Sequence, residues 1–206
     1  MGRPPDPTIR PRLLAQILEV MKEQPLSWVT FRGLAASLDV STYTLSYHFG
    51  SRAELIDTIL ETTVRARADI MGDLDMSTLS RAEMRDFLHK GYALSLTDPY
   101  LAGVRLQFEA GALEGVDEDM GTRVRHSHQM WNTQFHSWLL NQGASEPTAS
   151  HAARAIADLF FGAHFGFVLN KDAAHSLDAV IFAIDALFDA ALPHAAATVP
   201  GTSENA

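Results

Sequence analysis

The chain has 206 residues, 47% of them hydrophobic, and a formal net charge of −9. It has no cysteine, which excludes disulfides, cysteine-ligated zinc and thiol nucleophiles. No apolar run reaches the roughly 20 residues that a membrane span needs, and the proline-rich start lacks the hydrophobic core of a signal peptide. The sequence therefore predicts a cytoplasmic protein with no membrane partner.

The negative charge is unevenly distributed along the chain. Residues 1–55 carry six Lys or Arg and five Asp or Glu, a net +1, whereas residues 56–206 carry ten and twenty, a net −10. A weakly basic first part on an acidic remainder would limit non-specific binding to DNA. The proline-rich start has Arg3, Arg10 and Arg12 in it or near it. It is either a basic arm that enters a minor groove of DNA or a poorly ordered terminus.

Three helices are expected within residues 9–49. Apolar residues at helical spacing predict the first over residues 9–22. Thr30 is a typical N-cap for a short second helix, whose buried face carries Leu34, Ala35 and Leu38. Asp39 can adopt the backbone of a tight turn. Ser41 then caps a third helix with Leu45 and Phe49 on its buried side.

The opposite side of the third helix carries Thr42, Tyr43, Thr44, Tyr47 and His48, with no acidic residue among them. Two short helices joined by a tight turn, the second with a polar outer face, are typical of a helix-turn-helix. In that motif the second helix enters the major groove of DNA.

These residues resemble the TetR family of bacterial transcription regulators. The residues that match the family pattern are Thr30, Leu34-Ala35, Val40-Ser41, Leu45, His48-Phe49 and Leu55. The residues that depart from it are Asp39 and Tyr43, where the family has Gly, Ser46, where it has Tyr, and Arg52, where it has Lys. The match covers about a quarter of the chain. It implies an all-α protein with a three-helix DNA-binding head and a helical-bundle body that binds a ligand and dimerises.

The resemblance also implies which residues bind DNA. Thr30 and Arg32 are expected to contact phosphate. The hydroxyls and ring of Thr42, Tyr43 and Thr44 on the reading helix are expected to meet base edges, and Ser41 is a further DNA-binding candidate. Tyr47, His48 and Arg52 are expected to hold phosphate. The alternative for His48 is a structural hydrogen bond within the head.

A long helix should join the head to the body. Ser51 and Glu54 form a capping-box pattern, and apolar spacing continues to about Met71. We therefore expect a head over 1–55, a body over 56–192 and a disordered tail over 193–206.

The body is predicted to contain helices only, because no segment shows the two-residue alternation of a strand. A polar break is expected over 72–80 and a flexible connection over 111–115. Pro147 suits the first turn of a helix, and Asp172 suits a cap. The expected helices cover 81–96, 100–110, 118–140, about 147–170 and 173–192, which makes about nine in all.

The last two helices suggest a subunit interface. Residues 159–169 are apolar nearly all round, and Gly162 and Gly166 share a face. The sequence predicts a two-fold four-helix bundle through Phe160, Gly162, Phe165, Gly166, Ile181, Ile184 and Phe188. The alternative is that both apolar stripes fill the core of one subunit.

A ligand pocket is implied by the family resemblance, which also favours a repressor released by a small molecule. The residues expected to form the pocket are His89, Tyr92, Arg105, Phe108, Glu109, His128, Trp131, Phe135 and Phe161, and their aromatic content favours an apolar or aromatic effector. Further polar candidates are His136, Arg154 and His164.

No cofactor, metal ligand or catalytic residue is expected. The competing hypothesis is an all-helical metal-dependent enzyme or a small-molecule carrier. It rests on the carboxylate–histidine spacing of Asp86 with His89 and of Asp172 with His175, which occurs in di-metal bundles.

Overall fold

The computed structural model describes residues 6–71, 75–98, 100–116 and 122–193, with the side chains of residues 66–71 left out. Within these ranges every regular element is helical, so the all-α prediction is confirmed. The elements are α1 (Ile9–Met21), η1 (Leu26–Trp28), α2 (Phe31–Leu38), α3 (Thr42–Phe49), α4 (Arg52–Met71), η2 (Met76–Thr78), α5 (Arg81–Ser95), α6 (Tyr100–Glu114), α7 (Arg123–Asn141), α8 (Glu146–Asn170) and α9 (Ala173–Ala191).

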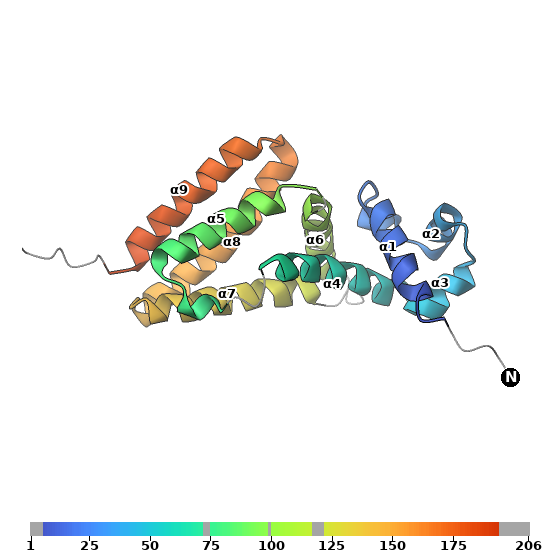
Figure 1. Ribbon diagram of the computed structural model, residues 1–206, viewed down its shortest axis with the longest axis horizontal. Helices are drawn as coiled ribbons and strands as arrows, with labels where there is room; N and C mark the ends of the chain where they lie inside the picture. The colour runs from blue at the N-terminus through green and yellow to red at the C-terminus, as the bar shows by residue number, and fades with distance from the viewer. Residues whose placement is uncertain (1–5, 72–74, 99, 117–121, 194–206) are drawn as a thin grey trace, which may run out of the picture.

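The helices form two groups along the long axis of the molecule (Figure 1). Helices α1–α3, here called the head, lie at one end, and α5 and α7–α9, with α6, make the body. Helix α4 runs from the head along the body, and α6 stands between the head and the other body helices. These two helices are therefore the ones placed to connect the two groups.

The core of the head extends beyond its three helices. Leu13, Leu34, Leu45 and other apolar side chains of the head are buried together with residues 55–60 of α4. Helix α6 adds Leu106 and Ala110 to the same cluster. Because burying apolar side chains is the main stabilising term in folding, the head cannot move independently of the first half of α4 and of α6 without exposing this core.

Local side-chain signals set the limits of α2 and α3 as the sequence predicts. Thr30 Oγ1 accepts a hydrogen bond from Gly33 N–H at 3.0 Å, and Ser41 Oγ accepts one from Thr44 N–H at 3.0 Å. Asp39 ends α2 in the left-handed conformation, with φ of 52°. The turn between the two helices is therefore encoded by short-range hydrogen bonds and by one residue that tolerates positive φ.

The start of α4 is held by the expected capping box. Ser51 N–H donates to the Glu54 carboxylate at 2.6 Å, and Glu54 N–H donates to Ser51 Oγ at 3.2 Å. Hydrogen bonds from the backbone N–H and the hydroxyl of Ser51 lower the pKa of the Glu54 carboxyl. Gly50 before the box has φ of 72°, a conformation that residues with a side chain rarely adopt, so this turn favours glycine.

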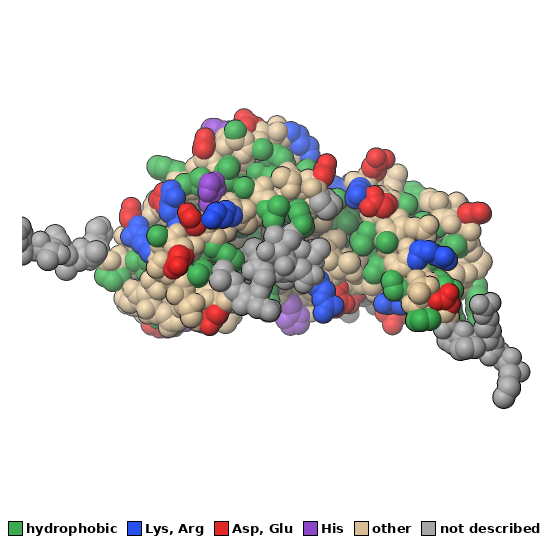
Figure 2. Space-filling view, in the orientation of Figure 1, with side chains coloured by type: hydrophobic (Ala, Val, Ile, Leu, Met, Phe, Trp, Pro, Cys, Tyr) green, Lys and Arg blue, Asp and Glu red, His purple; other side chains and the backbone are tan. Residues whose placement is uncertain are grey.

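The body has its own core, centred on α5, α7, α8 and α9. Trp138 packs against Phe188, with ring centroids 4.9 Å apart, and its indole N–H donates to the Leu79 carbonyl at 2.8 Å. Figure 2 shows basic and acidic side chains next to one another over α5 and α9, where Arg85 forms a bidentate pair with Asp185. This ion pair links α5 to α9 at the surface.

The structure corrects several predicted boundaries. Helix α6 continues to Glu114, so the flexible connection expected over 111–115 is mostly helix. The expected polar break over 72–80 contains η2, whose Met76 is buried with Leu79. The predicted start of α7 at residue 118 and nearly all of the tail expected over 193–206 lie outside the described residues.

Helix α8 bears on the expectation that no segment spans a membrane. Its 25 residues are long and apolar enough, by length and composition, to cross a membrane. A core helix of a soluble protein passes the same test. Because α8 packs against both α7 and α9 and buries Ala153, Ile156 and Phe167 among body side chains, we interpret it as a core helix.

Candidate DNA interface and ligand cavity

The outer face of α3 presents aromatic rings to solvent. Tyr43 and Tyr47 are 73% and 59% exposed, and their rings stack with centroids 6.2 Å apart. Thr42 and Ser46 are exposed beside them. Large apolar rings exposed on a helix of a small domain are a feature of binding surfaces, so this face is the candidate reading surface.

Three of the predicted DNA-binding hydroxyl groups also take part in structural hydrogen bonds. Thr30 and Ser41 are the caps of α2 and α3, and the Thr44 hydroxyl is 2.8 Å from Ser41 Oγ. Their backbone positions at the helix starts are compatible with phosphate contact, but their hydroxyls are already engaged within the head.

Arginines flank the α3 face, and the structure distinguishes their roles. Arg32 is exposed on α2, and the described residues give its guanidinium no hydrogen bond or ion pair. Arg52 donates through Nε to the Val29 carbonyl at 2.7 Å, so part of its guanidinium tethers α4 to the loop before α2. Arg10 donates to the His48 carbonyl at 3.1 Å and lies over the Phe49 ring.

His48 itself is half-buried with its ring edge-on to Tyr47, at 5.0 Å between centroids. Its backbone carbonyl accepts the hydrogen bond from Arg10, but its imidazole makes none to another residue of the described head. The structural alternative for this residue, a side-chain hydrogen bond within the head, is therefore not seen.

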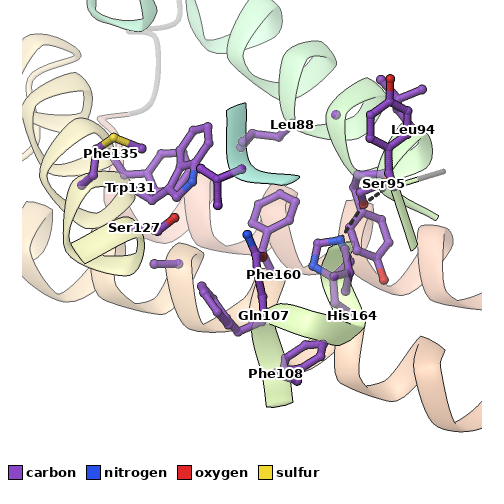
Figure 3. A pocket seen from close by; sticks show the side chains of 18 of the residues that line it. Leu88, Leu94, Ser95, Gln107, Phe108, Ser127, Trp131, Phe135, Phe160 and His164 are labelled. Atoms are coloured by element: carbon purple, nitrogen blue, oxygen red, sulfur yellow. Dashed lines mark hydrogen bonds between the residues drawn. The ribbon is translucent and has the colours of Figure 1, made fainter. Parts of the chain in front are cut away.

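The body contains a cavity of about 130 Å³ bounded by α4–α8. Figure 3 shows Trp131 and Phe135 at one side, His164 and Ser95 at the other, and Phe160 between them. Five predicted pocket residues line it, namely Tyr92, Phe108, Trp131, Phe135 and Phe161. Phe, Tyr and Trp make up eight of its nineteen described lining residues, and most of the others are aliphatic.

Four predicted pocket residues do not line this cavity. His89 lies half-buried on α5, outside the lining. His128 Nε2 is 2.8 Å from Asp158, which also accepts from Arg154. Arg105 and Glu109 point to the head instead. The helical period placed all four on partly buried faces, but it does not tell which neighbour a face meets.

Arg105 and Glu109 join α6 to the end of α1. The Arg105 guanidinium donates to the Met21 carbonyl at 2.6 Å and to the Gln24 carbonyl at 2.9 Å. Glu109 accepts a hydrogen bond from Leu26 N–H and lies 3.7 Å from Arg105. A cation at free carbonyls of a helix C-terminus is favourable, so this pair, here called the α6 clasp, fastens the head to the body.

The sequence pointed to His164 only as one polar candidate among several, and it missed its partner. Ser95 Oγ is 2.5 Å from His164 Nε2 and donates to the Tyr92 carbonyl at 2.6 Å. Both side chains are buried. Other lining residues that were not predicted include Gln107, Ser127 and Phe160. A histidine inside the apolar stretch of α8 was the sequence signal for this side of the cavity.

The predicted interface residues on α8 and α9 divide into two sets. Ile184 and Phe188 are buried in the body core, whereas Phe160 is half-buried and lines the cavity. Ile181 is half-buried. Gly162, Phe165 and Gly166 lie on the outer side, with no atom within 4 Å of a Cβ built on either glycine.

The spacing that suggested a metal site does not bring metal ligands together in the described part of the chain. Asp86 forms a surface pair with Lys90, and Asp172 caps α9 by accepting from His175 N–H at 3.0 Å. No group of three His, Asp or Glu side chains suitable for a metal occurs among these residues.

Comparison with known proteins identifies the head. Residues 13–59 match the model of bacterial regulatory proteins of the tetR family. This match identifies residues 13–59 as a TetR-type N-terminal domain. The chain therefore carries a DNA-binding helix-turn-helix of transcription regulators, as the sequence predicted. A search of curated protein sequences finds no match to this chain.

Solved structures extend the similarity of fold to the TetR-type body. A transcriptional regulator from Rhodococcus sp. Rha1 has a TM-score of 0.73 at 16% identity, over 89% of this chain and 97% of its own. A TetR transcriptional regulator from Legionella pneumophila has a TM-score of 0.67 at 18% identity, over 90% and 98%. The multidrug binding protein EbrR, solved with imidazole, has a TM-score of 0.65 at 17% identity, over 93% and 94%. At these identities the likeness concerns the fold.

Proposed function

We propose that this protein is a cytoplasmic TetR-type repressor that binds a palindromic operator as a homodimer and is released when a small apolar or aromatic effector occupies the body cavity. The observation that carries the proposal is that the cavity and the head core share two helices. Val64 of α4 and Val104 of α6 line the cavity, while Leu60 and Leu106 of the same helices lie in the head core.

The α3 face supplies the proposed DNA contacts. Tyr43 and Thr42 stand exposed at the start of the helix, where the N-terminal residues of a reading helix meet base edges. Arg32 is placed for phosphate on the adjacent α2. Tyr47, beside Tyr43, is placed for a phosphate or sugar contact at the edge of the same surface.

The proposed dimer forms through the outer sides of α8 and α9. Phe165, Leu169 and Phe182 are 52%, 65% and 77% exposed there. A groove lined by Gly162 and Gly166 runs between the two helices. Exposed apolar side chains next to a groove favour a self-complementary contact of the isologous type. This face lies on the predicted helices, but it does not include Ile184 and Phe188, which are buried, or Phe160, which lines the cavity.

Release would be mechanical. An effector in the cavity would shift α4, and with it the paired heads, from the spacing of about 34–36 Å that matches one turn of DNA. Helix α6 would shift with α4, because the two helices pack closely at Gly103, where an added Cβ would lie 3.1 Å from the Thr63 side chain. The effector must have different affinities for the bound and released states to drive this change. The multidrug binding protein EbrR, which shares the fold and was solved with imidazole, supports a small-molecule effector.

Selection of bound sequences from a random DNA pool tests DNA reading. We expect a palindromic site for the wild type. Tyr43→Ala should blur particular bases, whereas Arg32→Gln should weaken all sequences alike and reduce the slope of log affinity against log salt by about 1, as the removal of one phosphate-binding charge does. Arg125→Gln, which removes an exposed arginine of the body, is the matched control. If no sequence is enriched at low salt, the proposal fails.

Sedimentation of the purified protein tests the interface. Phe182→Glu would place a charge on the proposed contact and should give monomers. Leu140→Glu alters an exposed leucine of α7 and should leave the dimer intact. Dimers of equal stability for both variants would exclude the α8–α9 face.

A further inference from the structure

The charge of the cavity wall limits the kind of ligand that the cavity can bind. It is lined by about a dozen apolar or aromatic side chains, and no Asp, Glu, Lys or Arg occurs among the described residues that form it. Phe108 and Phe161 meet edge to face, with centroids 6.3 Å apart, and Trp131 stacks on Phe135 at 5.8 Å. Moving a charged group from water into such surroundings without an opposite charge is strongly unfavourable.

Several polar groups in the wall are already hydrogen-bonded within the protein. Burial raises the pKa of the Tyr92 phenol, which is hydrogen-bonded to the Ser176 hydroxyl at 2.5 Å. Its hydroxyl therefore stays protonated. Ser95 and His164 are bonded to each other. These groups stabilise the wall by satisfying one another, as buried polar atoms generally must.

Two hydroxyls remain for a ligand. Ser127 of α7 and Tyr100 of α6 line the cavity, and the described residues provide neither hydroxyl with a hydrogen bond. In Figure 3 Ser127 lies between Trp131 and Gln107, at the aromatic side of the cavity. Hydroxyls both donate and accept hydrogen bonds, so they suit an uncharged polar substituent.

The size of the cavity limits the ligand further. At about 130 Å³ it is close to an apolar protein cavity of about 150 Å³ that stays dry and binds benzene. A single aromatic ring with a short substituent fills this space.

We infer that the effector is an uncharged molecule of about one aromatic ring, whose single polar substituent is bound by the hydroxyls of Ser127 and Tyr100. The inference rests on the proposed function, since it concerns the same cavity. It goes beyond an apolar effector in excluding cations and carboxylates and in naming the residues that select the polar group.

The test uses four probes of nearly equal shape: toluene, benzyl alcohol, benzoate and benzylammonium. Binding to the full chain is measured at pH 7 by calorimetry and by the shift in Tm. We expect benzyl alcohol to bind and the two ions to bind more weakly by about tenfold or more. Tighter binding of benzoate, which a protonated His164 would favour, or of benzylammonium would overturn the inference, as would the absence of binding by all four.

Variants of α7 locate the bound probe. Ser127→Leu fills the cavity and should abolish binding of benzyl alcohol, while Ser137→Leu, at a serine of the same helix outside the cavity lining, should not. Ser127→Ala should weaken benzyl alcohol by about threefold to tenfold and leave toluene unchanged, with no steric burden on the fold. Equal effects of Ser127→Ala on both probes would overturn the role of the hydroxyl.

DNA binding is a separate readout. If a neutral ring compound binds in the cavity but leaves the affinity for the selected operator unchanged, the release function fails while the ligand class stands. If only a charged compound binds and releases DNA, the release function stands and the ligand class fails.

Discussion

The α6 clasp offers a direct test of how the body holds the head. Arg105→Met removes the guanidinium that donates to the carbonyls of Met21 and Gln24, and it leaves Glu109 without its cation. Methionine keeps most of the length and apolar volume of the arginine stem. The substitution therefore isolates the charged hydrogen bonds from the packing.

The expected cost follows from the geometry. Hydrogen bonds to charged groups contribute about 1.5–3 kcal/mol each. The Arg105 side chain is 27% exposed, so water compensates for part of the removed interaction. We expect the free energy of unfolding to fall by about 2–4 kcal/mol, which for a chain of this size lowers Tm by about 4–16 °C.

The assay is chemical and thermal unfolding of Arg105→Met beside Arg125→Met, which removes an exposed arginine of α7. Glu109→Gln should cost less than Arg105→Met, because an amide oxygen can still accept from Leu26 N–H. The double variant should be destabilised by less than the sum of the single variants, since the two side chains interact. If Arg105→Met is no more costly than Arg125→Met, the clasp does not stabilise the head–body junction.

Three further predictions concern single interactions. The hydrogen bond from Arg123 holds the pKa of the Asp57 carboxyl below its ordinary 3.8. This ion pair therefore stabilises the fold fully above pH 3.8, and the stabilisation is lost as the pH falls through the lowered pKa. When Tm is measured from about pH 7 to about pH 3, it should fall less for Asp57→Asn than for the wild type. Phe188→Ala should cost about 3–5 kcal/mol in urea unfolding, because it opens a cavity against Trp138; a cost below about 1 kcal/mol would contradict this packing. Gly50→Ala should cost about 1–2 kcal/mol through its positive φ, and should loosen hydrogen exchange in α3; unchanged exchange would contradict it.

The cavity shows where sequence reasoning reached its limit. Trp131, Phe135 and Phe161, which the sequence predicted as pocket residues, line the cavity. The same reasoning placed Arg105 and Glu109 in the pocket, whereas they lie on the side of α6 that meets the end of α1 and η1. The hydrophobic period gives the side of a helix that is covered, but not the element that covers it.

Helices α8 and α9 show the same limit at the proposed subunit interface. Both are apolar over so much of their circumference that several faces were possible contacts. Only packing in three dimensions assigns Ile184 and Phe188 to the body core and leaves Phe165 and Phe182 outside. A run of apolar residues carries no information about which of them the rest of the chain will reach.

The helix-turn-helix, by contrast, was determined by the sequence itself. Thr30 and Ser41 cap the two helices through hydrogen bonds to residues three positions away, and Asp39 ends α2 in a conformation set by its own backbone. Such signals act within one helical turn, so neighbouring residues in the sequence are enough to recognise them. The cavity, the α6 clasp and the exposed face of α8 and α9 depend on packing between residues up to about a hundred positions apart, so their partners were decided only by the tertiary structure.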